Sequence, residues 1–180
     1  MALVVAGGLG RAERRGRRRR DPLPGAEPGA GASTHLSRVQ GLLALSLLML
    51  DRRDERDVLQ LMTTGVPALA PCRALGVLLD DDTWTPAGPA ADGGVPLTRA
   101  CVEAVPPGGG PVPVAGEAWA WALPMRTRDG LIGHLIVVAP SAPDDNELGL
   151  LRTLAQQAAV AVGNARLHAS SAAVNAALAE

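Results

Sequence analysis

Few side chains in this sequence could do chemistry, and they are widely spaced. The three histidines are His35, His134 and His168, and the only cysteines are Cys72 and Cys101. No Ser-x-x-Lys, Gly-x-Ser-x-Gly, His-Glu-x-x-His, phosphate-loop or Cys-x-x-Cys motif occurs. Because no catalytic group has a partner at a recognisable spacing, we predict that the chain is not an enzyme.

His134 is the most informative of these residues. It lies between Ile132 and Ile136 in an apolar segment, whereas His35 and His168 lie in positions expected to be exposed. Two interpretations remain open. His134 is either a buried, hydrogen-bonded structural histidine, or it donates to or ligates a molecule held in a cavity.

The cysteines and the acidic run at 80–82 have simpler interpretations. Three consecutive aspartates on a turn cannot all point at one ion, so we predict a polar turn and no metal site. Cys72 and Cys101 are expected to be small buried apolar residues. A small redox enzyme that uses Cys101 remains an alternative.

The composition narrows the class of protein. The 180 residues suffice for one domain with tails, and no stretch of about 18 apolar residues predicts a membrane span. Two cysteines are too few for a disulfide scaffold, which favours the cytoplasm. Seven arginines crowd residues 11–20, and we predict that 1–32 form a disordered tail and linker. From Ser33 onward, ten arginines face fifteen acidic residues, so nucleic-acid binding by this domain is not expected.

The elements that would position His134 form a hairpin. Alternating small and large residues predict a strand over 118–125, and β-branched residues predict a second over 131–139. A two-residue Asp129-Gly130 turn would place Met125 opposite His134 and Leu123 opposite Ile136. We expect the alanine face to pack on a helix and the tryptophan face to border a cavity. The predicted pocket residues are Trp84, Cys101, Trp119, Trp121, Leu123, Met125 and His134.

Helical periodicity flanks these strands. It predicts helices over 33–50, 54–69 and 145–179, and a short helix over 96–104. Further strands are expected over 73–79 and 83–86, with a weak edge strand over 111–115. Asp54 and either Asp144 or Asp145 would cap two of the helices.

Both long helices carry more apolar surface than one contact requires. Residues of the last helix repeat at heptad spacing, and the first helix has an unusually broad apolar band. We therefore predict a homodimer whose interface contains Leu42, Leu45, Met49, Val160, Leu167, Val174 and Leu178. The seam runs to the end of the sequence, which predicts either a frayed dimer helix or a connection to an output domain.

One known family shares this order of segments. The segment Leu-Ile-Gly-His-Leu-Ile-Val-Val at 131–138, the acidic helix start at 144–147, and the groups Gln157-Ala158-Ala159 and Asn164-Ala165-Arg166-Leu167 resemble the C-terminal half of a GAF domain. The resemblance implies an α+β fold, an antiparallel sheet of five or six strands flanked by N- and C-terminal helices. It assigns 33–168 to the domain and 169–180 to a helical extension.

The resemblance also implies a function. GAF domains are typically sensory modules, so we expect a cytoplasmic domain that binds a small molecule or partner and signals through dimer-interface helices to an output domain or partner protein. The expected context is transcriptional regulation or two-component-type signalling, with no membrane contact. Val102 follows Cys101 where bilin-binding members have histidine, and a haem could be held only through His134, so no cofactor is identified. A ligand-free dimerisation module, with its cavity filled by tryptophans, is the alternative.

Overall fold

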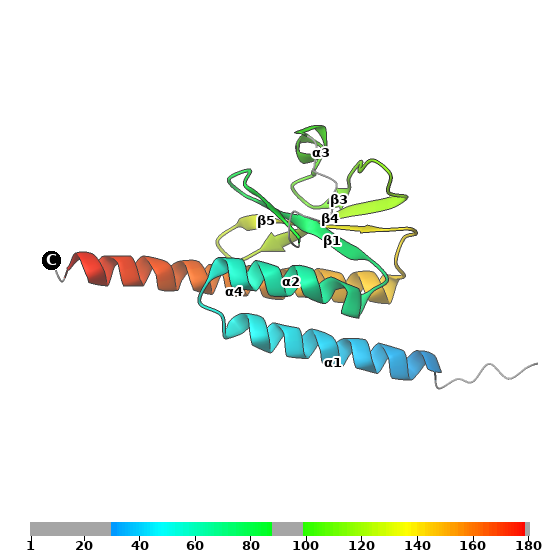
Figure 1. The fold of residues 1–180 in the computed structure, drawn as a ribbon, viewed down its shortest axis with the longest axis horizontal. Helices are drawn as coiled ribbons and strands as arrows, with labels where there is room; N and C mark the ends of the chain where they lie inside the picture. The colour runs from blue at the N-terminus through cyan, green and yellow to red at the C-terminus, as the bar shows by residue number, and fades with distance from the viewer. Residues whose placement is uncertain (1–29, 88–98, 179–180) are drawn as a thin grey trace, which may run out of the picture.

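The computed structural model describes residues 30–87 and 99–178 (Figure 1). Residues 1–29, 88–98 and 179–180 lie outside this description, and so do the predicted Arg-rich tail and the first part of the predicted 96–104 helix. The elements follow one another as α1 (Ala30–Leu50), α2 (Glu55–Leu69), β1 (Arg73–Leu79), β2 (Trp84–Pro86), α3 (Arg99–Glu103), β3 (Gly110–Pro111), β4 (Trp119–Arg126), β5 (Leu131–Ala139) and α4 (Asp145–Ala177).

The five strands form one antiparallel sheet in the order β2-β1-β5-β4-β3. Helices α2 and α4 pack side by side on one face of the sheet, and α1 packs on both of them as an outer layer (Figure 1). We call the covered side the helix face and the opposite side the distal face. Helix α3 lies over the distal face, away from the other helices. The predicted α+β class is confirmed.

Aspartates begin both helices, as the sequence predicts, and at α4 the capping residue is Asp144 rather than Asp145. The Asp54 side chain accepts a hydrogen bond from the Arg56 backbone N–H at the start of α2. At α4, Asp144 accepts from the Glu147 N–H, and the Glu147 carboxylate accepts from the Asp144 N–H. This reciprocal capping box satisfies N–H groups that have no partner within the helix.

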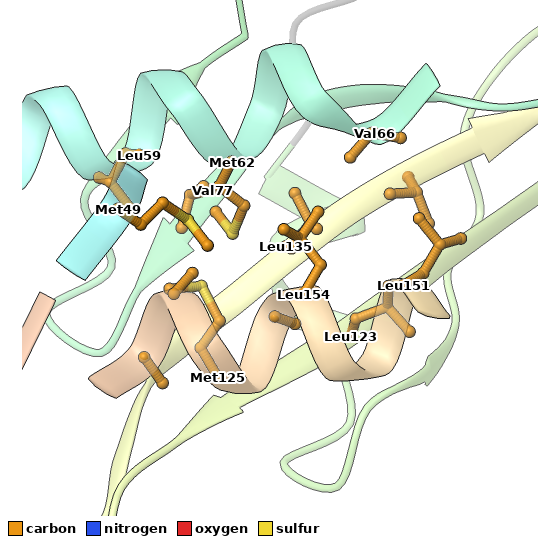
Figure 2. Close-up of a cluster of buried hydrophobic side chains, with 14 of the residues drawn as sticks. Met49, Leu59, Met62, Val66, Val77, Leu123, Met125, Leu135, Leu151 and Leu154 are labelled. Carbon is orange, nitrogen blue, oxygen red and sulfur yellow. The ribbon is translucent and has the colours of Figure 1, made fainter. Parts of the chain in front are cut away.

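The main core lies between the helix face of the sheet and the helices (Figure 2). Apolar side chains from three layers meet there, and the largest are fully buried. They include Met49, Met62, Leu69, Leu123, Met125, Leu135, Leu151 and Leu154.

The predicted register of the β4–β5 hairpin is wrong by one residue. Leu123 pairs with Leu135, and Pro124 pairs with His134. The connection is a four-residue loop, Thr127–Gly130, closed by a hydrogen bond from the Thr127 N–H to the Gly130 carbonyl. A bulge shifts the register beside this loop, between Met125 and Arg126. The longer loop and the extra residue together shift the pairing by one, and such a slip exchanges which residues share a face.

The predicted orientation of the hairpin is also wrong. Trp119, Trp121, Leu123 and Met125 lie on the helix face, whereas Ala120 and Ala122 lie on the distal face. The physical reason is complementary volume. The buried line of α4 consists largely of small residues, Ala155, Ala158, Ala159, Val162 and Ala165, so large sheet side chains fill the space that the helix leaves.

The outer helix also differs from the expectation. Leu42 and Met49 are buried in the domain's own core and Leu45 packs against it, so placing Leu42 and Met49 in a partner interface is wrong. The side of α1 that faces solvent carries other leucines: Leu36, Leu43, Leu47, Leu48 and Leu50.

Candidate functional site

The sheet divides the seven predicted pocket residues between its two faces. Trp119 and Trp121 stack on the helix face, with ring centroids 5.9 Å apart and planes inclined by 14°. Leu123 and Met125 are fully buried beside them. These four residues therefore share no surface with His134, which alternation along β5 places on the distal face with Ile136 and Val138.

The distal face has a small apolar cluster of its own. It gathers side chains from three strands and from the segments around β3, with Trp84 and Val105 packed against it. The buried members are Leu75, Val112, Val114, Ala120, Ala122, Ile136 and Val138. Ala120 and Ala122 of β4 thus belong to the apolar cluster on the distal face.

Trp84 reaches the distal face because β1 has a glycine beneath it. A Cβ atom at Gly76 would lie 2.6 Å from the indole Cη2 of Trp84 and 2.3 Å from the Thr85 carbonyl oxygen. Only a residue without a side chain allows β2 and its tryptophan to approach β1 so closely. Of the three tryptophans, only Trp84 shares the distal side with His134.

Cys101 lies on α3 and is buried. Its thiol donates to the Pro113 carbonyl oxygen at an Sγ–O distance of 2.6 Å, which ties α3 to the segment after β3. Cys72 lies just before β1 and belongs to the main core, where burial, and then the Glu147 carboxylate, raise its pKa to about 11. The two cysteines therefore have separate environments and form no disulfide.

His134 places a buried polar side chain on the distal face. The side chain is 6% exposed, and within the described residues its Nε2 atom is buried with no hydrogen-bond partner. Burial lowers the pKa of the imidazole, opposed by the backbone carbonyls of Pro107 and Pro106, so the ring is neutral at pH 7. Leaving a buried polar atom unpaired costs roughly 1–3 kcal/mol.

A separate hollow of about 680 Å³ lies between the β4–β5 turn and α4. Its lining is mixed, with Arg128 and Asp129 from the turn and Val160, Asn164 and Leu167 from the helix. The sequence analysis places Val160 and Leu167 on a dimer seam but does not predict this hollow, because loop and helix meet only in the folded chain.

The described residues offer no metal site and no membrane span. No three His, Cys, Asp or Glu side chains in 30–87 and 99–178 come together as ligands for a metal ion. None of the helices in those ranges is both long and apolar enough to cross a membrane.

Comparison with known proteins shows the fold. No family model matches the sequence, and no curated protein matches it. Among solved structures, the chain is similar to the "GAF domain of a putative sensor histidine kinase from Pseudomonas syringae pv. tomato", with 20% identity and a TM-score of 0.53. The match covers 79% of this chain and 96% of that one. The chain therefore has a GAF-like fold, as the resemblance at 131–167 predicts.

Proposed function

We propose that this GAF-like domain is a cytoplasmic sensor that binds a small molecule over the distal face and transmits its presence through α1 and α4. The observation that carries the proposal is the buried Nε2 atom of His134, for which the described part of the chain supplies no hydrogen-bond partner. A buried polar atom without a hydrogen-bond partner destabilises the folded protein. A ligand that supplies the missing hydrogen bond removes this destabilisation.

The surroundings of His134 define the class of ligand. The distal cluster is apolar, and the imidazole is neutral at pH 7 because burial lowers its pKa. A compact, largely apolar molecule with one hydrogen-bonding group suits this surface better than a strongly charged one.

The signal would be transmitted by a homodimer in which α1 and α4 contact the second subunit. In the described residues, every large apolar side chain that is prominently exposed belongs to α1, to α4 or to the residue that caps α4. On α4 and its C-cap these are Val160, Leu167, Val174 and Leu178, at the four- and three-residue spacings of a coiled-coil seam when Asn164 and Ser171 are included. On α1 the corresponding positions are Leu36, Leu43, Leu47 and Leu50. We propose that these two rows meet their copies in a second subunit.

Native mass spectrometry of the full chain, purified from its own cells, tests ligand binding. We expect a dimer with an added small-molecule mass that disappears on unfolding. His134→Gln should lose most of that mass, whereas the exposed-histidine control His168→Gln should keep it. A wild-type dimer with no added mass would favour the alternative, a ligand-free dimerisation module.

Sedimentation tests the dimer separately. Leu43→Glu with Leu47→Glu, or Leu167→Glu with Val174→Glu, should give folded monomers because each pair places charges in an apolar contact. Ser37→Glu, an exposed change on the same helix away from the leucine row, should remain dimeric. Dimers that persist in both double variants would contradict the interface.

The environments of the cysteines argue against the redox alternative. Both side chains are buried, and the pKa of Cys72 is raised to about 11, so little reactive thiolate forms there at neutral pH. Peroxide turnover by the wild type that is lost in Cys101→Ser would instead support the redox alternative.

A further inference from the structure

Helix α4 leaves the body of the domain abruptly. Ala165 is buried, Arg166 is half-buried, and every residue from Leu167 to Leu178 is exposed. The last part of α4 therefore projects away from the sheet (Figure 1). A signal carried along α4 from the body of the domain to that projecting part crosses the boundary at Arg166.

Arg166 makes two ion pairs of different strength. Its Nε and Nη2 donate to Oε2 and Oε1 of Glu55 at 3.0 and 3.1 Å, a bidentate pair with the first residue of α2. Its Nη1 lies 3.6 Å from Oδ1 of Asp80, the residue after β1. The Glu55 pair has the planar fork geometry that makes arginine–carboxylate contacts strong, and the Asp80 pair does not.

Asp80 is tied to the strand that carries His134. Its backbone N–H donates to the Ile132 carbonyl at 3.0 Å, and the two residues before it, Leu79 and Leu78, pair with Gly133 and His134. Contact between these strands is tight, because a Cβ at Gly133 would lie 2.4 Å from the Leu78 carbonyl oxygen. A shift of His134 along or across the sheet therefore moves Asp80 with it.

We propose that Arg166 is a positioning residue that couples the distal face to the projecting part of α4, with Asp80 as the coupling contact and Glu55 as the anchor. The inference rests on the proposed function, since it assigns the route by which occupancy near His134 would reach α4. Arg166 itself touches no ligand.

The weakness of the Asp80 contact suits this role. Both side chains are more than one-third exposed, and pairs of this kind change an equilibrium by a factor of only about two to five. A ligand shifts a two-state element only by its difference in affinity for the two states, so a weak contact is easily biased. The bidentate Glu55 pair keeps the helix attached in both states.

Amide hydrogen exchange on the full chain tests the coupling without a known ligand. His134→Gln, and Ile136→Val as a milder change on the same face, act as the perturbations. Each should change exchange of the 167–178 amides by about threefold in the wild-type background. In an Asp80→Asn background that response should vanish. In a Glu55→Gln background exchange should rise overall, but the response should persist.

The outcomes separate this inference from the proposed function. A response of the same size in the Asp80→Asn background, or no response in the wild type to either perturbation, would overturn the coupling through Asp80. Native mass spectrometry of Asp80→Asn adds a second readout, and we expect it to retain any bound small molecule. A wild-type protein that shows the response but carries no ligand would contradict only the proposed function.

Discussion

The guanidinium of Arg38 on α1 donates to the carboxylate of Glu147 on α4, with Nη1 and Oε1 2.6 Å apart. The same carboxylate closes the capping box of α4 through the Asp144 N–H. One side chain therefore both begins α4 and holds the outer helix to it, and Glu147 is only 9% exposed.

Replacing Arg38 and replacing Glu147 should lower the free energy of unfolding by different amounts. Arg38→Ala removes one ion pair and should lower the free energy of unfolding by about 1 kcal/mol. Glu147→Ala also removes a capping contact and should cost about 2 kcal/mol. Glu147→Gln keeps the cap, so it should resemble Arg38→Ala. Urea unfolding measures all three, and equal effects of Glu147→Ala and Glu147→Gln would contradict the dual role.

Gly133→Ala should destabilise the sheet. The new Cβ would lie 2.4 Å from the Leu78 carbonyl oxygen and 2.9 Å from the Leu79 Cα, both backbone atoms that cannot move independently. Overpacking of this kind costs about 1–3 kcal/mol. Gly149→Ala on α4 is the matched control, because nothing lies within 4 Å of its added Cβ. It should stabilise the protein by about 0.5–1 kcal/mol, and thermal melts should move in opposite directions.

Stability should fall at alkaline pH because of Cys72. Burial, and then the Glu147 carboxylate, raise the pKa of this thiol from 9.0 to about 11. Below pH 9 the thiol is protonated in both states, and between pH 9 and 11 only the unfolded chain loses the proton, so folding is penalised. The chain has no lysine or tyrosine to titrate in this window.

Unfolding free energies from pH 8 to about 11 measure this effect. Cys72→Ala should show a shallower decline than the wild type, and Cys101 is present in both proteins and cancels in the comparison. If the unfolding free energies of the two proteins fell in parallel with pH, the pKa of Cys72 would not be raised by folding.

His134 should produce a loss of stability at acid pH. Burial lowers its pKa below the usual 6.5, so the folded state favours the neutral ring. As the pH falls below 6.5, the unfolded chain binds a proton at His134 that the folded chain does not yet bind, so the free energy of unfolding declines. His134→Gln should flatten this part of the curve, whatever its effect at pH 7. An unchanged slope between pH 6.5 and 5 would place the imidazole in contact with solvent.

Local signals in the sequence are sufficient to predict most elements. The caps Asp54 and Asp144, the break after Leu50 and the β-branched run at 131–139 all act over a few residues, and β1 and β5 have the predicted bounds. Edge elements are harder to predict, because β3 has only two residues where 111–115 was expected, and prolines there limit pairing.

Relations between elements are not determined by such local signals. The register of the hairpin depends on a bulge at Met125/Arg126, and an Asp-Gly pair cannot reveal whether the loop has two residues or four. The face that meets α4 depends on how an alanine-rich helix fills space against large side chains. On α1, both leucine rows have helical spacing, and only contact with α2 and α4 decides that Leu42 is buried and Leu43 exposed.

The candidate site was therefore predicted in part. His134 stands out in the sequence as a polar residue in an apolar strand, and its buried Nε2 atom has no hydrogen-bond partner within residues 30–87 and 99–178. Trp84 is also among the predicted pocket residues, but its place on the distal face could not be predicted, because it depends on the space above Gly76. The ion pairs of Arg166 join segments more than 80 residues apart in the chain, and no sequence pattern indicates them.

Nitrogen-15 NMR of the His134 imidazole tests the central claim most directly. The spectrum of the protein as purified from its own cells is compared with that of the same protein stripped by unfolding, dialysis and refolding. We predict that the Nε2 resonance moves on stripping, because a bound molecule had supplied its hydrogen bond. Superimposable Nε2 resonances in the two samples would contradict a ligand at His134.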